Sequence, residues 1–525
     1  MSAGTLVINV VAGLALAGGF VAQMVRWLRV LQREHYDPSS MIRFLGRWSS
    51  PPAGAAGAPD RIRNRRPFTL SHFLFIALLV TVLLGEDALV VLTSMAYGWF
   101  CPWGLGLRGR TGQLRWTRRL TTIAVVSSTV AVLIAALGVL SPRPWLLAVS
   151  CVWAVPPLLD VTTRVLEPFE RRAARRYVDQ AAARLARVHP MVVAITGSYG
   201  KTSTKNHLVD LLRDEGAVMA SPRSYNNRAG LSKAINEHLA DGTRVFVAEM
   251  GTYGPGEIRD LCSWCVPDVA VVTAIGPVHL ERMRSLEVIE QAKFEITERA
   301  GVVILNVDDP RLARWVPRLE GQGKRVVRAG SKSAEVDIRV RVHEGSWVVV
   351  VGGDELASVP IVAGLQPTNV ACALAAALET GAAPGAAAAR MSGIAGVANR
   401  AQVGTAGSGV VVIDDTFNAN PSSATASLDL LWSLPLGGRR VVVTPGLIEL
   451  GSLQYGENLS LAQKVLARGG ELVVVGRTNV VPMAIGAEQR LRRFDTREQA
   501  VEWVRSALVP GDGVLYLNDL PDHYP

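Results

Sequence analysis

The sequence predicts a multi-pass helical membrane region followed by two α/β domains, the first of which carries a phosphate-binding loop. Three observations support this fold class. Long uncharged stretches are confined to the first 164 of the 525 residues. After residue 190, buried-strand patterns alternate with helical ones. A glycine-rich turn that ends in Lys201-Thr202 joins one of those strands to a helix.

The chain is apolar, and its positive charge is unevenly spread. Hydrophobic residues make up 49% of it, mean hydropathy is +0.24, and net charge is +10. The first 190 residues hold 22 basic and 9 acidic side chains, which leaves 33 basic and 36 acidic for the remainder. Because the basicity belongs to one segment, nucleic-acid binding by the whole chain is not expected. Five scattered cysteines exclude a disulfide scaffold.

Four apolar stretches precede residue 164. Residues 5–25 are uncharged over about the 20 residues that span a bilayer. No basic residue precedes them, which makes a signal peptide the weaker alternative. Residues 120–140 form a second clean span, whereas 68–103 are interrupted at Glu86-Asp87 and 144–159 are shorter.

Arginine placement predicts how these stretches cross. Three connections are arginine-rich, and the positive-inside bias places all of them in the cytoplasm. An even number of crossings must then separate them, so we expect one hairpin turning at Glu86-Asp87 and another at Ser141-Pro142-Arg143. A re-entrant pair is the alternative for the first. About five membrane helices within 1–164 follow, in the plasma membrane, with the rest of the chain cytoplasmic. The three connections are 26–66, 108–119 and 164–176.

Residues 165–190 are predicted to be a basic helix that joins the membrane region to the soluble part. Its arginines suit anionic lipid headgroups.

The soluble part begins with a strand, a glycine turn and a helix. Val192–Ile195 is typical of a buried parallel strand and leads into T-G-S-Y-G-K-T-S-T. Glycines let backbone N–H groups approach phosphate oxygens, and the helix start adds partial positive charge. Lys201 is expected to reach the outer phosphates and Thr202 to bind Mg²⁺. The usual first glycine is Ile195 here, but Lys201 is the first of only seven lysines, which favours a chemical role.

Two polar residues follow the next predicted strands. Glu249 ends the run Val245–Ala248, and His279 follows Val269–Thr273. Ligands of open α/β sheets lie beyond the carboxyl ends of the strands, so both residues are expected near the phosphate loop. A carboxylate and a neutral imidazole there could hold a divalent metal. A solvated glutamate and a structural histidine are the alternatives.

These motifs resemble those of the Mur ligases, cytoplasmic enzymes that add amino acids to the peptidoglycan precursor by ATP-driven amide formation. The resemblance covers about residues 190–525 and is closest to the branch that adds the D-alanyl-D-alanine dipeptide. Besides the phosphate loop, the similar segments are N-N-x-x-G at 226–230, E-M-G at 249–251, I-G-x-x-H-L-E at 275–281, A-K-x-E-I at 292–296 and D-D-T-F-N-A-N-P at 414–421.

The resemblance implies an ATP-binding Mur-ligase-like central domain at 191–385 and a smaller, Rossmann-like C-terminal domain at 386–525. In the latter, the runs VVVID, VVVTPG, ELVVVG and GVLYL read as strands. The implied reaction is amide formation through an acyl phosphate. Two rivals stay open: a Mur-like ligase that extends another polymer such as poly-γ-glutamate, and a membrane NTP-binding regulator that does not ligate.

The resemblance also implies roles for single residues. Lys293 would be carbamoylated by CO₂ and thereby help to hold a second Mg²⁺; an ordinary helix ion pair is the alternative. The implied catalytic residues are Lys201, His279 and Lys293. The implied metal ligands are Thr202, Glu249, His279 and Lys293. The implied ATP contacts are Thr196, Gly197, Gly200, Lys201, Thr202, Ser203, Asn369, Arg400 and Asp415. The implied substrate contacts are Asn227, Asn418 and Asn420.

Two departures from the family pattern stand out. The family's His-Asn pair with a second Asn reads Thr368-Asn369 and Cys372 here, so its adenine contacts are only partly present. A membrane region takes the place of the domain that binds the UDP-sugar. We therefore expect a cell-wall precursor or lipid-linked acceptor at the bilayer, and an amino acid or dipeptide as the amine.

Overall fold

The computed structural model describes residues 3–38, 40–49, 66–102, 105–107, 114–137, 144–222, 225–333, 335–362, 365–395, 401–416 and 419–518. Contacts divide the chain into two compact units. The first consists mainly of residues 1–173 with 474–500, and the second of 174–473 with 501–518.

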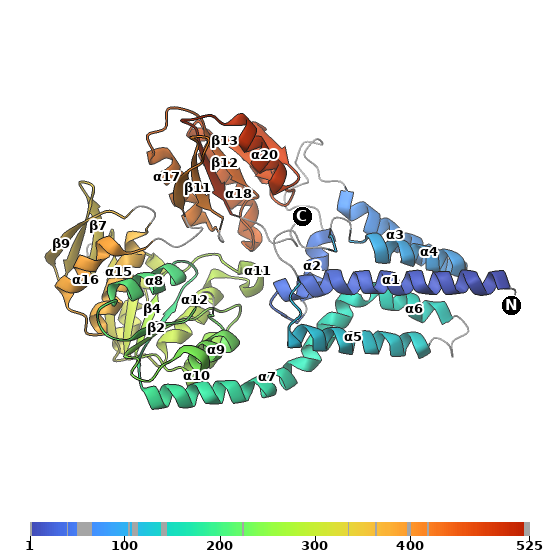
Figure 1. Cartoon of the computed structure of the whole chain (residues 1–525), viewed down its shortest axis with the longest axis horizontal. Helices are drawn as coiled ribbons and strands as arrows, with labels where there is room; N and C mark the ends of the chain where they lie inside the picture. Colours follow the sequence, from blue (N-terminus) through green and yellow to red (C-terminus); the bar gives the residue numbers. More distant parts are fainter. Residues whose placement is uncertain are drawn as a thin grey trace. The chain divides into compact units, whose positions relative to one another are not determined.

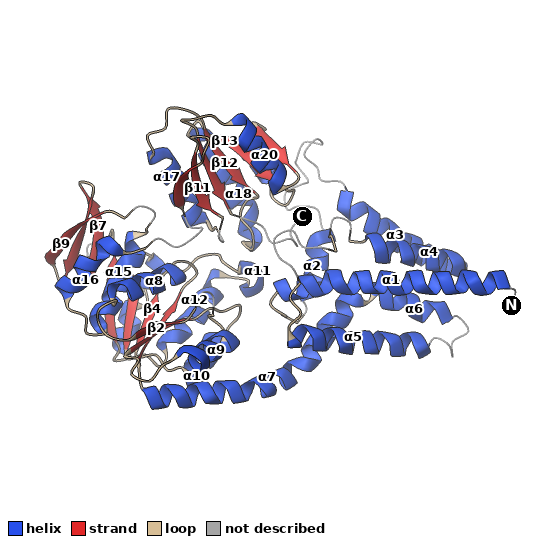
Figure 2. Ribbon diagram, in the orientation of Figure 1, coloured by secondary structure: helices blue, strands red, loops and turns tan. Residues whose placement is uncertain are grey.

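Among the described residues, the elements before residue 189 are all helices, and strands occur only after residue 190 (Figures 1 and 2). Helix α1 packs against α4 and α6, α3 packs against α4, and α5 packs against α6. The helices are α1 (Ala3–Arg33), α2 (Ser40–Ser49), α3 (Arg66–Leu84), α4 (Asp87–Phe100), α5 (Arg118–Leu137), α6 (Pro144–Trp153) and α7 (Val155–Val188).

Helices α1 and α4 touch at their backbones. A Cβ built on Gly98 would lie 2.9 Å from Gly19 Cα, and such small-residue crossings are typical of helices packed in lipid. One turn further along α1, the buried Gln23 donates to the carbonyls of Tyr97 and Gly98, both at 3.1 Å. Arg26 also donates to the Gly98 carbonyl, at 2.8 Å. The Tyr97 carbonyl also accepts from the Cys101 N–H at 2.9 Å, whereas the Gly98 carbonyl lies in the last turn of α4, where carbonyls lack helical partners.

Two described helices are long and apolar enough to cross a membrane, Val10–Arg33 and Arg118–Leu137. A third span is added if α6 and α7, bent by 73° at their junction, count as one. Gly85, with φ +74°, separates α3 from α4, so the predicted break at Glu86-Asp87 is confirmed. The second predicted turn, at 141–143, lies outside the described residues, and the five crossings stay a prediction.

Helix α7 runs without interruption from Val155 to Val188. The basic helix predicted at 165–190 is therefore the later part of a longer helix. Pro156 and Pro157 lie in its first turn, where proline costs no backbone hydrogen bond.

The second unit contains a nine-stranded sheet of order β2-β3-β1-β4-β5-β6-β7-β8-β9. Its first six strands are parallel, β7 continues parallel to β6, and β8 and β9 add an antiparallel extension. The three strands predicted around the phosphate loop are confirmed as β1, β3 and β4. The bounds are β1 (Met191–Thr196), β2 (Val218–Ala220), β3 (Val245–Glu249), β4 (Val269–Val272), β5 (Val302–Asn306), β6 (Arg325–Gly330), β7 (Ile338–His343), β8 (Ser346–Val351) and β9 (Asp354–Pro360).

Both faces of this sheet are covered, as expected of parallel strands that read as continuous apolar runs. On β1, Val192 packs into the core formed with α9, α10, α12 and α13, and Val193 into the core formed with α8, α15 and α16. These helices are α8 (Lys201–Leu211), α9 (Arg228–His238), α10 (Glu257–Trp264), α12 (Leu286–Phe294), α13 (Pro310–Ala313), α15 (Pro367–Glu379) and α16 (Pro384–Arg390), with α11 (Leu280–Met283) and α14 (Val316–Gly321) completing the set.

The packing of this sheet continues past residue 385. Arg390, at the end of α16, donates to the Leu211 carbonyl at 3.0 Å and pairs with Glu215 at 3.0 Å. The next strand, β10, begins at Gln402 and belongs to the second sheet.

The second sheet has six strands in the order β10-β11-β15-β12-β13-β14. Strands β11, β15 and β12 are parallel, and β10 is antiparallel to β11. The four strands predicted here are confirmed as β11, β12, β13 and β15. The bounds are β10 (Gln402–Thr405), β11 (Val411–Asp415), β12 (Arg440–Thr444), β13 (Glu471–Val475), β14 (Leu491–Phe494) and β15 (Gly513–Leu517), with helices α17 (Pro421–Ser433), α18 (Gln454–Ala467), α19 (Val480–Gly486) and α20 (Arg497–Ala507).

Candidate active site

The predicted phosphate loop forms a strand, a tight turn and a helix. After Thr196 the chain turns through Gly197, with φ +149°, and Gly200, with φ +81°, and α8 begins at Lys201. A Cβ on Gly197 would clash with the Thr273 hydroxyl, and one on Gly200 with the Asn369 side chain. The backbone N–H groups in the first turn of a helix have no helical partners and attract anions, so the start of α8 is a suitable anion-binding site.

Lys201 and Thr202 lie at this turn in positions that suit their predicted roles. Lys201 Nζ donates to the Gly197 carbonyl at 2.7 Å and so lies across its own loop. The Thr202 hydroxyl donates to Glu249 Oε2 at 3.0 Å. The structure thus brings together two of the predicted metal ligands.

Sequence analysis missed two partners of Glu249. Lys205 Nζ lies 3.1 Å from Glu249 Oε2, and both side chains are only 3% exposed. The same ammonium donates to the Ser221 carbonyl at 2.9 Å, and the Asn226 amide donates to Glu249 Oε1 at 3.2 Å. The spacing of Lys205 four residues after Lys201, which puts both on one face of α8, could have indicated it.

Replacing Lys205 with methionine is expected to destabilise the protein strongly. The change leaves the buried Glu249 carboxylate without its cation, a loss that costs about 3–5 kcal/mol of unfolding free energy. Thermal denaturation in detergent should show a clear fall in the midpoint. Lys233→Met is the control, because Lys233 is about half exposed and pairs with Glu237 at 3.9 Å, a pair worth about 1 kcal/mol or less. Equal midpoints for the two variants would contradict the prediction.

His279 lies between β4 and α11 in a left-handed conformation, with φ +57° and ψ +24°. Its Nδ1 lies 2.6 Å from Glu449 Oε2 in the loop that follows β12, a partner that sequence analysis missed. Burial lowers the pKa of His279, and the Glu449 carboxylate opposes this only in part. With the Nδ1 proton directed at Glu449, the Nε2 lone pair is left for a metal, as in most metal-bound histidines.

Lys293, on α12, is 4% exposed. Burial, followed by the positive charge of Lys201, holds its pKa well below the usual lysine range, although Glu257 and Glu249 act in the opposite direction. Among the described residues, no hydrogen bond or ion pair engages its ammonium nitrogen. Burial thus favours the neutral amine form of this side chain.

Within the described ranges, no three His, Cys, Asp or Glu side chains gather as a metal cluster. The predicted metal set differs in composition, since it uses the Thr202 hydroxyl and a carboxylate formed on Lys293. These ligand roles stay predictions.

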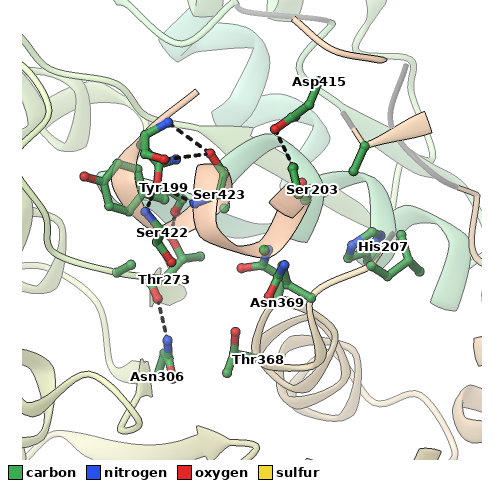
Figure 3. A pocket seen from close by; sticks show the side chains of 18 of the residues that line it. Tyr199, Ser203, His207, Thr273, Asn306, Thr368, Asn369, Asp415, Ser422 and Ser423 are labelled. Atoms are coloured by element: carbon green, nitrogen blue, oxygen red, sulfur yellow. Dashed lines mark hydrogen bonds between the residues drawn. The ribbon is translucent and has the colours of Figure 1, made fainter. Parts of the chain in front are cut away.

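A cavity of about 340 Å³ opens beside the phosphate loop (Figure 3), a size that suits a small-molecule ligand. Gly200 and Ser203 line it from the turn and α8, Asn369 from the start of α15, and Asp415 from the end of β11. The structure thus places four of the predicted ATP contacts around one space.

Other predicted residues have local structural roles. Asn420 also lines the cavity, but its side chain caps α17 and accepts from the Ser422 and Ser423 amides at 3.0 and 2.9 Å. Asn227 is exposed and caps α9 by accepting from the Gly230 amide at 2.9 Å. Their substrate roles stay predictions. Arg400 and Asn418 lie outside the described residues.

A phosphate loop, a buried glutamate beside its threonine and a second α/β domain lining the same cavity define a nucleotide-dependent α/β enzyme. The Mur ligase middle domain matches residues 195–377. The chain is 34% identical over 383 residues to a UDP-N-acetylmuramoyl-tripeptide--D-alanyl-D-alanine ligase of Mycobacterium bovis, with coverage of 65% of this chain and 73% of that protein. It therefore belongs to the Mur ligase family, whose members are ATP-dependent amide-bond-forming ligases.

Two further comparisons agree with this family assignment. The ligase of the same name from Bacillus subtilis is 31% identical over 300 residues, covering 57% of this chain and 62% of that protein. The crystal structure of MurF ligase from Thermotoga maritima in complex with ADP superposes with a TM-score of 0.56 at 25% identity, covering 66% of this chain and 80% of that one.

Proposed function

We propose that this chain is a membrane-anchored ligase that uses ATP to join D-alanyl-D-alanine, or a similar amine, to a cell-wall precursor. The observation that carries the proposal is the single cavity lined by the phosphate loop, Asn369 and Asp415. The M. bovis and B. subtilis relatives, which carry that activity in their names, supply the substrate class.

In the proposed reaction, the acceptor carboxylate attacks the γ-phosphorus of ATP, which releases ADP and leaves an acyl phosphate. The amine then attacks the carbonyl carbon, the bond to the phosphate oxygen breaks, and the amine loses a proton. Proteins catalyse such phosphoryl transfer mainly by positioning and charge neutralisation. Lys201 and the first turn of α8 provide positive charge at the phosphates.

The residues present suit Mg²⁺. The buried Glu249 carboxylate accepts a hydrogen bond from the Thr202 hydroxyl. The Nδ1 of His279 contacts Glu449, which leaves Nε2 for a metal. The Glu249 carboxylate and the Thr202 hydroxyl are oxygen ligands, which Mg²⁺ prefers, and His279 would add a nitrogen. When bound there, Mg²⁺ would neutralise charge on the phosphoryl oxygens.

Lys293 suits carbamoylation. A neutral amine can attack CO₂ to form an N–C bond, with loss of one proton and formation of a carbamate anion. Burial lowers the pKa of Lys293 and so favours the neutral amine, and the product would add a negative charge near Lys201.

The membrane part of the proposal rests on α1 and α5, which are long and apolar enough to span. Apolar side chains on the outside of the helices support it, among them Leu14, Leu83 and Leu133, at 69%, 85% and 59% exposed. We place about five crossings before residue 164 and the two α/β domains in the cytoplasm, where ATP is found. A lipid-linked acceptor is the expected consequence.

Product analysis of the full chain in detergent tests the proposal. Given ATP and Mg²⁺, ADP release should require both an acceptor and an amine, with D-alanyl-D-alanine preferred over glutamate. Lipid-linked and UDP-linked precursors are compared as acceptors, and the product mass is measured. A preference for glutamate would favour a different polymer, and ADP release that needs no amine would favour a regulator; either result overturns the proposal.

A further inference from the structure

The cavity wall contains two buried polar side chains without partners. His207, on α8, is fully buried, and neither of its ring nitrogens has a hydrogen-bond partner among the described residues. The Tyr199 hydroxyl is buried and equally unpartnered there. Both residues line the cavity beside the phosphate loop (Figure 3). Buried polar groups are nearly always satisfied by protein, water or ligand, so these two groups are available to pair with a molecule that enters the cavity.

The position of His207 indicates which part of a nucleotide it meets. It follows Ser203 by four residues, so the two side chains share one face of α8, and Ser203 lines the same cavity. Measured along the helix, His207 lies about 9 Å from Lys201, at 1.5 Å per residue. Phosphates held at the start of α8 therefore place the nucleoside end of the molecule, not its phosphates, beside His207.

The chemistry of the imidazole suits a base. Burial lowers the pKa of His207 to about 4, and Asp210 opposes this only in part. A neutral imidazole carries one donor and one acceptor. Adenine offers an amino donor and ring-nitrogen acceptors along its edges, whereas the phosphates offer acceptors alone. An adenine edge can thus form a hydrogen bond with a neutral histidine in either tautomer, because it offers both a donor and acceptors.

We propose that His207, on α8, recognises the adenine base of ATP through a hydrogen bond to one of the imidazole ring nitrogens. The inference rests on the proposed function, because it requires ATP in this cavity. His207 is then a specificity-determining residue that binds the base and takes no part in the phosphoryl transfer.

The test compares ATP, GTP and inorganic triphosphate as ligands of the full chain in detergent, by calorimetry or ligand-induced thermal shift. In His207→Leu, the dissociation constant for ATP should rise about tenfold, the usual effect of one lost hydrogen bond. Inorganic triphosphate, which reports on the phosphate loop alone, should bind unchanged. Preference for ATP over GTP should fall. The ligand-free variant should be at least as stable as the wild type, because leucine removes two unsatisfied nitrogens.

Thr204→Val is the matched control. Thr204 lies on the same helix, and its hydroxyl is also buried and unpartnered among the described residues, but it does not line the cavity. Its ATP affinity should equal that of the wild type. Unchanged ATP affinity in His207→Leu, or an equal loss for ATP and triphosphate, would overturn the base contact. A wild-type chain that binds no triphosphate would instead overturn the proposed function itself.

Discussion

Lys201→Ala is expected to abolish ligation, lowering kcat by on the order of 10³ while leaving the protein folded. Groups that neutralise charge developing in a transition state are worth about 10²–10³ each in rate, and Lys201 is the cation at the start of α8. Its ammonium donates to the Gly197 carbonyl of its own loop. The measurement is amine-dependent ADP release.

Lys201→Arg should be nearly as inactive, because the planar guanidinium does not replace a compact ammonium in a tight turn. Lys332→Ala is the control, since Lys332 is exposed after β6, and it should retain wild-type turnover. Turnover near the wild-type level in Lys201→Ala would contradict the assignment of this loop as the nucleotide-binding loop.

Lys293→Arg should lower kcat by on the order of 10²–10³, comparable with the loss of one charged group from such a site. Arginine stays protonated in proteins, so it can neither act as the neutral amine nor accept CO₂. Ligation by the wild type should likewise fall in CO₂-depleted buffer and recover with bicarbonate. A carbon-13 carbamate signal after labelling with ¹³CO₂ provides a direct measurement.

Lys324→Arg provides the matched control for that change. Lys324 donates to the Ala300 carbonyl at 2.9 Å, within reach of solvent, and the variant should keep its activity. Lys293→Arg with full activity, or wild-type ligation indifferent to CO₂, would show that Lys293 acts only as a buried structural residue.

Local sequence patterns were sufficient to predict much of the α/β fold. Val192–Ile195 and Val245–Ala248 are continuous apolar runs because both faces of the sheet are covered, and such runs identify parallel strands. The glycines of the phosphate turn identify a backbone conformation that few other residues adopt. Strands β7 to β9, which pair antiparallel with one another, carry weaker patterns with exposed residues interspersed, and the sequence did not predict them.

Contacts between distant segments could not be predicted from one sequence. Glu449 reaches His279 across 170 positions, and no local pattern indicates such a pair. The resemblance implies base contacts on the helix that begins near Thr368. His207 lies on α8, which packs against that helix, and only the folded chain shows that it borders the same cavity.

The close approach of Asn369 to Gly200 has a thermodynamic consequence. Because a Cβ at position 200 would lie 2.3 Å from Asn369 Oδ1, the turn and the start of α15 are in close contact, and we expect movement of one to affect the other. A ligand that orders the turn is then expected to restrict α15 as well. The entropy lost on ordering is therefore shared between the phosphate end and the nucleoside end of ATP. Inorganic triphosphate and adenosine should therefore assist each other's binding as separate molecules, so that the affinity of ATP reflects cooperation as well as the sum of its parts.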